Sequence, residues 1–228
     1  MLTLSKNARQ ILNERYLLKD NKGHIIETPQ QLFKRVAQFV ASCEQSQKPF
    51  FEGQFYKMLS GLYFLPNSPT LMNAGCKKGQ LSACFVLPVE DSLKDIFNTL
   101  KYAALIHQSG GGTGFNFSKL RPKDDLVSSS SGTSSGPVAF IKVYDAATEY
   151  VKQGGKRRGA NMGILNVNHP DIEAFITSKS SEDAIENFNI SVGISDDFMV
   201  AVEQDLNWNL INPRTKTITK VLKAKEIW

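Results

Sequence analysis

The sequence is poor in the residues that build covalent or metal-bound frameworks. It has three cysteines and three histidines among 228 residues. Cys43, Cys76 and Cys84 form neither a CxxC pair nor a zinc-ligand spacing. A structural metal site is therefore not expected, and Cys43, which lies on an amphipathic segment, is expected to be a packed, inert thiol.

Long apolar runs are also missing. No run approaches the roughly 20 residues that cross a bilayer, and residues 1–6 do not have the charged-then-apolar layout of a secretory signal. The hydrophobic share of 41% and the charged share of 21% are ordinary for a globular protein. We expect a cytoplasmic protein that is not bound to a membrane.

Charge is unbalanced toward the positive side, with a net charge of +5 and a pI near 9.0. Such a surplus suits the binding of anions such as nucleotides, whether free or polymeric. The positive residues gather at 77–78, 152–158 and 216–225 rather than in one stripe. Nucleic-acid binding would give an affinity for single strands that falls steeply with salt, but RNP-like and helix-turn-helix patterns are missing.

The pattern of apolar residues changes after Tyr63. Residues 1–62 have apolar positions at helical spacing and predict a helical region. Residues 63–228 alternate strand-like and helix-like segments, which predicts an α/β domain whose sheet is incomplete. The expected strands cover residues 82–89, 115–120, 161–167 and 188–194, the expected helices begin near residues 92, 137, 170 and 195, and a hairpin is expected after residue 208.

Three short patterns are candidates for chemistry. Cys84 lies in an apolar strand-like run, where a thiol is either a buried structural residue or part of a site. Ser68, in a Ser-Pro-Thr turn, either serves the turn or holds an anion with its hydroxyl group. Four glycines within residues 110–114 exceed what a helix C-cap needs and indicate close approach of the backbone to another body.

Two polar segments predict flexible loops. Residues 123–136 are rich in serine and glycine and predict a loop within one domain rather than a linker. Residues 153–159 combine glycines with cations. The second loop is either solvated or responds in shape to a bound anion.

The order of these motifs resembles that of ribonucleotide reductase large subunits, most of all the adenosylcobalamin-dependent (class II) branch. The similarity covers about residues 5–228 and rests on several motifs at matching separations. These are Asn-Ser-Pro-Thr-Leu-Met-Asn-Ala-Gly at residues 67–75, Ser-Ala-Cys-Phe-Val-Leu-Pro at residues 82–88, and the segments 109–122 and 153–161. The resemblance implies a helical region followed by the first part of a ten-stranded α/β barrel.

The resemblance also implies roles for single residues. Cys84 matches one of two thiols that are oxidised to a disulfide as the ribose 2′-hydroxyl leaves as water. Matches to positions that contact the substrate are Ser68, Ala83, Gly111 and Gly112. Further residues match positions that bind a deoxynucleoside triphosphate or ATP effector at a dimer interface, or that relay the identity of the effector to the choice of substrate base. These are Asp91, Arg121, Gln153, Arg157 and Arg158.

The implied activity is that of a ribonucleoside-diphosphate reductase of the thioredoxin-disulfide type, acting by thiyl-radical chemistry that starts from adenosylcobalamin. No Asn-x-Cys-x-Glu motif for the radical cysteine and catalytic glutamate is present in the sequence. The chain is therefore expected to need a C-terminal half of the reductase, and a thioredoxin-like reductant. The alternative is a non-catalytic module that binds nucleotides and dimerises.

Overall fold

The computed structural model describes residues 4–77, 79–127, 132–153, 157–180 and 185–228, and the side chains of residues 152–158 are not described. The chain divides into two compact units. One comprises Met1–Ala83 with Ser109–Gly111, and the other Cys84–Gln108 with Gly112–Trp228. The boundary expected between residues 62 and 63 lies within the first unit.

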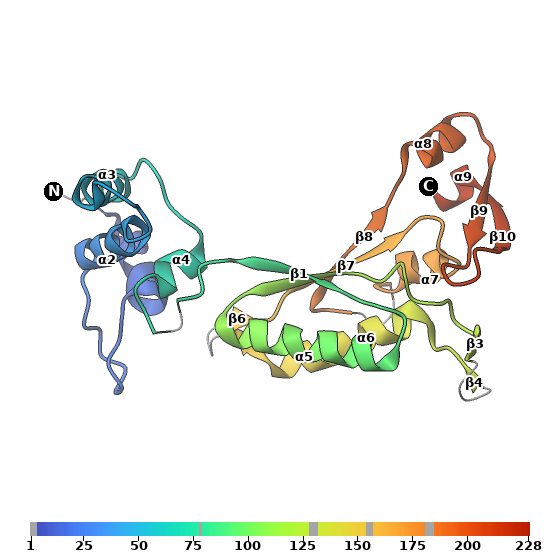
Figure 1. Ribbon diagram of the computed structural model, residues 1–228, viewed down its shortest axis with the longest axis horizontal. Helices are drawn as coiled ribbons and strands as arrows, with labels where there is room; N and C mark the ends of the chain where they lie inside the picture. Colours follow the sequence, from blue (N-terminus) through green and yellow to red (C-terminus); the bar gives the residue numbers. More distant parts are fainter. Residues whose placement is uncertain (1–3, 78, 128–131, 154–156, 181–184) are drawn as a thin grey trace. The chain divides into compact units, whose positions relative to one another are not determined.

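The first unit is helical, and α2 (Pro29–Ala41) is its centre (Figure 1). The helix begins at a capping box, because the side chain of Thr28 accepts from the backbone N–H of Gln31 and the Gln31 side chain accepts from that of Thr28. Its buried residues pack against α3 and α4. The other helices of this unit are α1 (Lys6–Ile11), the π-helix η1 (Leu12–Tyr16), α3 (Lys48–Ser60) and α4 (Ser68–Asn73).

An ion pair explains why the segment after Tyr63 belongs to this unit. Arg35 of α2 pairs with Glu27 at 2.7 Å, with side chains only 13% and 6% exposed. The same guanidinium donates to the carbonyl oxygens of Leu71 and Ala74 at the end of α4. Helix α4 is therefore held by the helical unit rather than by the sheet.

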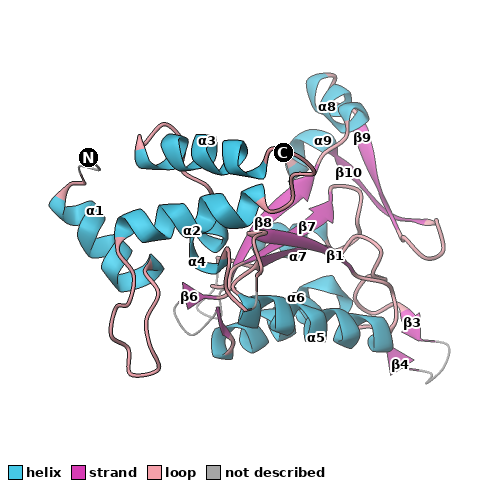
Figure 2. Cartoon of the chain, turned by 60° about the vertical axis from the view of Figure 1, so that its left-hand side comes forward, coloured by secondary structure: helices cyan, strands magenta, loops and turns pink. Residues whose placement is uncertain are grey.

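The second unit is built on a parallel sheet of β1 (Cys84–Pro88), β2 (Gly112–Asn116), β7 (Asn161–Asn166) and β8 (Phe188–Gly193), in that order. Parallel neighbours need crossover connections, which are α5 (Leu93–Ser109), α6 (Gly136–Tyr150) and α7 (Ile172–Thr177). Helices α5 and α6 lie side by side on one face of the sheet in both views (Figures 1 and 2). The α/β class expected from the sequence is confirmed.

Aromatic rings fill the space between the sheet and these helices. Phe115 of β2 meets Tyr144 of α6 edge-on at 5.1 Å between ring centroids, and Phe117 and Phe188 pack around them. The Tyr144 hydroxyl donates to the Ile96 carbonyl of α5, and burial raises the pKa of Tyr144. This core fixes α5 and α6 on the sheet.

After the last strand of the sheet, the chain forms a helix, a β-hairpin and a short final helix. Ser195 caps α8 (Asp196–Glu203) by accepting from the N–H of Phe198, as expected. Strands β9 (Asn207–Ile211) and β10 (Ile218–Lys223) form the expected antiparallel hairpin, and α9 (Ala224–Ile227) ends it. Phe198 and Trp208 join the hairpin to α8 through an edge-on ring contact at 5.1 Å.

Both segments expected to be loops contain short ribbons. Strands β3 (Leu126–Val127) and β4 (Gly132–Thr133) pair in the first, and β5 (Lys152–Gln153) and β6 (Arg157–Arg158) in the second. Residues 128–131 and 154–156 lie outside the described residues.

Two expectations were wrong. The strand expected over residues 115–120 is β2, at Gly112–Asn116, because the glycine-rich segment itself enters the sheet. Cys43 is exposed rather than packed, because α2 ends at Ala41 and its buried face ends with it. No helix in the described part of the chain is long and apolar enough to cross a membrane.

Candidate functional site

Cys84 is the first residue of β1 and pairs in register with Gly112, the first residue of β2. Because the two strands are parallel, their first residues share one edge of the sheet. Cys84 is an exposed, free thiol. The structure therefore brings the predicted redox cysteine to the glycine-rich segment and leaves its sulfur accessible.

The glycines of this segment have separate tasks. Gly110 follows the end of α5 with φ +98°, the left-handed conformation typical of a helix C-cap. Gly112 and Gly114 lie in β2, where a Cβ atom added at Gly114 would meet Phe85 of β1 and Met162 of β7 at ordinary contact distances. Gly110 thus serves the cap, and Gly112 and Gly114 form strand backbone, with Gly112 directly beside Cys84.

Ser68, Ala83 and Gly111 belong to the first unit, whereas Cys84 and Gly112 belong to the second. Ser68 is the first residue of α4, and its Oγ lies 2.9 Å from the Tyr16 hydroxyl of η1. Sequence reasoning missed Tyr16, since nothing in the sequence signals a contact across 52 residues. The substrate roles of Ser68, Ala83, Gly111 and Gly112 stay predictions.

A buried polar cluster lies behind the glycine-rich segment in the second unit. His107, Thr113, Thr148 and Asn161 are each at most 5% exposed, and hydrogen bonds of 2.7–3.1 Å join them. The cluster connects the end of α5, the start of β2, α6 and the start of β7. Sequence reasoning also missed this cluster, whose members look like ordinary core-facing polar residues.

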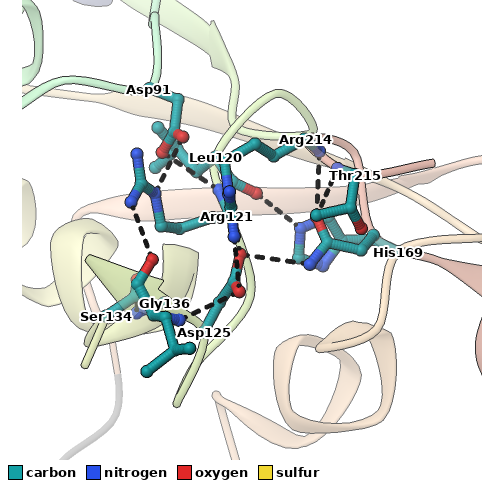
Figure 3. A network of polar contacts seen from close by, with 11 residues as sticks. Asp91, Leu120, Arg121, Asp125, Ser134, Gly136, His169, Arg214 and Thr215 are labelled. Carbon is teal, nitrogen blue, oxygen red and sulfur yellow. Dashed lines mark hydrogen bonds and ion pairs between the residues drawn. The ribbon is translucent and has the colours of Figure 1, made fainter. Parts of the chain in front are cut away.

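Asp91 and Arg121, two predicted effector residues, form an ion pair. The Asp91 carboxylate accepts from the Arg121 backbone N–H at 3.1 Å and from its Nε at 2.9 Å (Figure 3). Arg121 Nη1 donates to the carbonyl of Leu126 at 3.2 Å. Both side chains are about a quarter exposed or less, at 24% and 20%. The pair thus fixes Arg121 beside the β3–β4 ribbon.

This ion pair forms one wall of an open cavity of about 420 Å³. The cavity lies where α5 and α6 begin and where the β3–β4 ribbon ends. Its lining residues are Asp91, Ser92, Leu93, Ile96, Arg121, Val127, Thr133, Ser134, Ser135 and Phe140. Helix N-termini present free N–H groups and partial positive charge, so with Arg121 and the hydroxyl groups this wall can bind phosphate, while the apolar residues can contact a base.

Gly136 lets the start of α6 approach Lys123 and Asp171 closely. Its φ is +76°, and a Cβ atom there would lie 2.6 Å from Asp171 Oδ2 and 2.8 Å from the backbone nitrogen of Lys123. Asp171 Oδ2 accepts from that same N–H at 2.8 Å. The position therefore requires glycine both for its conformation and for its space.

His169 supports the same wall from behind and is 2% exposed. Its Nε2 lies 2.8 Å from the Leu120 carbonyl, and its Nδ1 accepts from the Asp171 backbone N–H at 3.0 Å. A neutral ring that carries its proton on Nε2 satisfies both contacts. Burial lowers the pKa of His169, which favours that neutral ring.

Of the predicted relay residues, only the backbone can be placed. Gln153 pairs with Arg157 across the β5–β6 ribbon, next to the pair of Lys152 and Arg158. The side chains of Gln153, Arg157 and Arg158 lie outside the described ones. Within the described residues, no group of three or more His, Cys, Asp or Glu side chains lies together as metal ligands would.

Comparison with known proteins matches two family models in succession. Residues 2–79 match the all-alpha domain of ribonucleotide reductase, and residues 82–226 match its barrel domain. The chain belongs to the ribonucleotide reductase family. This membership confirms the resemblance seen in the motifs. The break between the two matches, at residues 80–81, lies close to the division between the two compact units at Ala83 and Cys84.

Curated relatives agree with this membership. The vitamin B12-dependent ribonucleoside-diphosphate reductases of Thermoplasma acidophilum and Mycobacterium tuberculosis are 48% and 47% identical to the chain and match all of it. The ribonucleoside-diphosphate reductase large subunit of Caenorhabditis elegans is 36% identical over 89% of the chain. The chain spans 37%, 34% and 26% of these relatives' own lengths.

Proposed function

We propose that this chain is the N-terminal part of an adenosylcobalamin-dependent ribonucleoside-diphosphate reductase, which converts ribonucleotides to deoxyribonucleotides for DNA synthesis. The observation that supports this most is the exposed Cys84 thiol in register with Gly112 at one edge of the parallel sheet. The family membership and the names of its relatives agree with it.

In the proposed reaction Cys84 is one of two reducing thiols. The pair gives two electrons and two protons, the ribose 2′-hydroxyl leaves as water with C2′ gaining hydrogen, and the two sulfurs form a disulfide. Cys43 and Cys76 lie outside the matching motifs, so the second thiol must come from a part of the enzyme outside residues 1–228. A thioredoxin-like reductant would then restore both thiols.

We further propose that the cavity at Asp91 and Arg121 binds a deoxynucleoside triphosphate effector. Its support is the combination of Arg121, hydroxyl groups and two helix N-termini with an apolar side for the base. The β5–β6 ribbon with Gln153, Arg157 and Arg158 would relay the effector's identity to the substrate. A homodimer is proposed through α5 and α6, where Leu93, Phe97 and Tyr102 are exposed.

Cobalamin dependence rests on the names of the relatives. Among the described residues, none form a binding site that can be recognised as fitting a corrin. We therefore assign cobalamin binding to parts of the enzyme outside this chain. No role in cobalamin chemistry is therefore assigned to any residue of the chain.

The decisive experiment adds the missing part in trans. The purified chain is mixed with a complementary segment that contains the Asn-x-Cys-x-Glu motif, with adenosylcobalamin, a dithiol and a ribonucleoside diphosphate. Deoxyribonucleotide should form and should be lost with Cys84→Ser. Cys43→Ser is the matched control, since Cys43 is equally free and exposed but lies outside the motif.

Turnover that survives Cys84→Ser would contradict the assigned role of that thiol. The alternative function is a non-catalytic module that binds nucleotides, and the observation that favours it is the cavity at Asp91 and Arg121. It predicts that the chain binds deoxynucleoside triphosphates but gives no deoxyribonucleotide with any complementary segment.

A further inference from the structure

The tip of the β9–β10 hairpin contacts the base of the β3–β4 ribbon, 89 residues earlier in the chain. Arg214 donates to the Asp125 carboxylate from Nη2 at 2.8 Å and from Nε at 3.1 Å (Figure 3). Asn212 Nδ2 donates to the same carboxylate at 3.1 Å. Such a two-pronged contact of guanidinium with carboxylate fixes orientation as well as distance.

The hairpin presents Arg214 from a well-ordered turn. Asn212 is 5% exposed, and its Oδ1 accepts from the backbone N–H groups of Arg214 and Thr215 at 2.9 and 3.3 Å. The Asn212 backbone carbonyl accepts from Lys216 at 2.9 Å. Side-chain capping of this kind holds a turn in one conformation, so the position of Arg214 is set by the hairpin.

Asp125 in turn holds both strands of the ribbon. Its carboxylate accepts from the N–H of Leu126 at 2.9 Å, and its backbone carbonyl accepts from Ser134 at 2.9 Å. The ribbon residues Val127, Thr133 and Ser134 line the proposed effector cavity. Any shift of Asp125 is therefore transmitted to the cavity wall.

Charges alternate along this edge of the cavity. The hydrogen bond from Arg214 holds the pKa of Asp125 below its usual value, and Asp125 and Asp91 both favour the charged form of Arg214, raising its pKa. Arg121 pairs with Asp91 at the cavity itself. Loss of Arg214 would leave two carboxylates beside an anion site with one cation fewer.

We propose that Asp125 and Arg214 form a latch that positions the β3–β4 ribbon for nucleotide recognition, so that the β9–β10 hairpin takes part in effector binding without touching the ligand. The latch rests on the proposed function of the cavity. It makes Arg214 and Asp125 positioning residues, and it predicts that the pair acts as one unit.

The first test measures dTTP and dGTP affinity of the whole chain for Asp125→Asn, Arg214→Ala and the charge exchange Asp125→Arg with Arg214→Asp. Each single substitution should weaken binding about threefold to tenfold, a size typical of an accessible but bidentate ion pair. The exchange should recover part of the loss. Arg214→Lys should lie between wild type and alanine, because lysine keeps the charge but not the fork.

Lys220→Ala is the matched control. Lys220 lies on the same hairpin and pairs with Glu173, and both side chains are about half exposed. Neither residue lines the cavity in the described part of the chain. Its removal should leave nucleotide affinity unchanged, whereas an equal loss in Lys220→Ala and Arg214→Ala would overturn the latch as a specific device.

The second test needs no nucleotide. Amide hydrogen exchange at Leu126 and Ser134 should become faster in Arg214→Ala and stay at the wild-type rate in Lys220→Ala. Unchanged exchange overturns the latch, and faster exchange with unchanged nucleotide affinity overturns its role in recognition. If the wild-type chain binds no deoxynucleotide, the proposed effector function fails, and the exchange rates alone decide whether the latch exists.

Discussion

The Nε2 atom of His107 lies 3.0 Å from Oδ1 of Asn161, although 54 residues separate them and the side chains are 1% and 3% exposed. Because the amide oxygen can only accept, the histidine ring donates from Nε2. Thr113 donates to the same oxygen at 2.7 Å, and Asn161 Nδ2 donates to Thr148 at 2.8 Å. One asparagine thus connects α5, β2, α6 and β7 just behind the predicted substrate edge.

Replacing Asn161 by leucine should destabilise the protein. The change leaves buried partners such as His107 and Thr113 without their shared acceptor, and a buried polar group that loses its partner costs about 1–3 kcal/mol. The free energy of unfolding in urea measures the loss. Asn166→Ala is the control, since Asn166 is exposed at the other end of β7 and its removal should cost less than about 0.5 kcal/mol.

Equal stabilities of the two variants would show that the cluster around Asn161 contributes little. A loss confined to Asn161→Leu would show that the edge bearing Cys84 and Gly112 depends on polar contacts beneath it.

Stability should fall as the solution becomes acidic, because of His169. Its folded-state pKa lies below the ordinary histidine value of 6.5 as burial disfavours the charged ring, and the unfolded chain therefore binds the proton more readily. The neutral ring's contribution is complete above pH 6.5 and is lost as the pH falls through the lowered folded-state pKa. Urea unfolding at a series of pH values from neutral into the acidic range measures this slope.

His169→Gln should flatten the slope, since glutamine can still donate to the Leu120 carbonyl but does not titrate. His24→Gln serves as the control, because His24 is exposed and contacts Asp20 of its own turn. A slope that persists in His169→Gln would assign the acid sensitivity to other groups.

Local signals in the sequence predict several elements well. Ser195 is expected to begin a helix and does, because its hydroxyl meets the N–H three residues later. The strand at Cys84 is recognisable because it is a short apolar run. The strand at Gly112 is misplaced by a few residues, because glycine has no strand propensity of its own and pairing with β1 and β7 decides its conformation.

Contacts between distant segments cannot be read from composition or spacing. Asp91 and Arg121 are grouped only through the family resemblance, and each alone looks like an ordinary surface residue. Asp125 and Arg214 lie in polar turns 89 residues apart, and no local pattern singles them out. Such pairs depend on the topology of the sheet, which brings the ends of separate strands and hairpins together.

Gly136→Ala should lower both stability and nucleotide affinity. Alanine at φ +76° is strained by about 1–2 kcal/mol, and its Cβ would displace the Asp171 carboxylate and the Lys123 backbone nitrogen, which lie under 3 Å away. Gly23→Ala separates the two causes, because Gly23 has φ +85° but nothing within 4 Å of its Cβ position. Both variants should lose stability from strain, and Gly136→Ala should lose more.

Only Gly136→Ala should weaken dTTP binding, since Gly136 begins the helix whose N-terminus faces the cavity. An equal effect of the two substitutions on binding would mean that the close packing of α6 against Asp171 does not shape the nucleotide site.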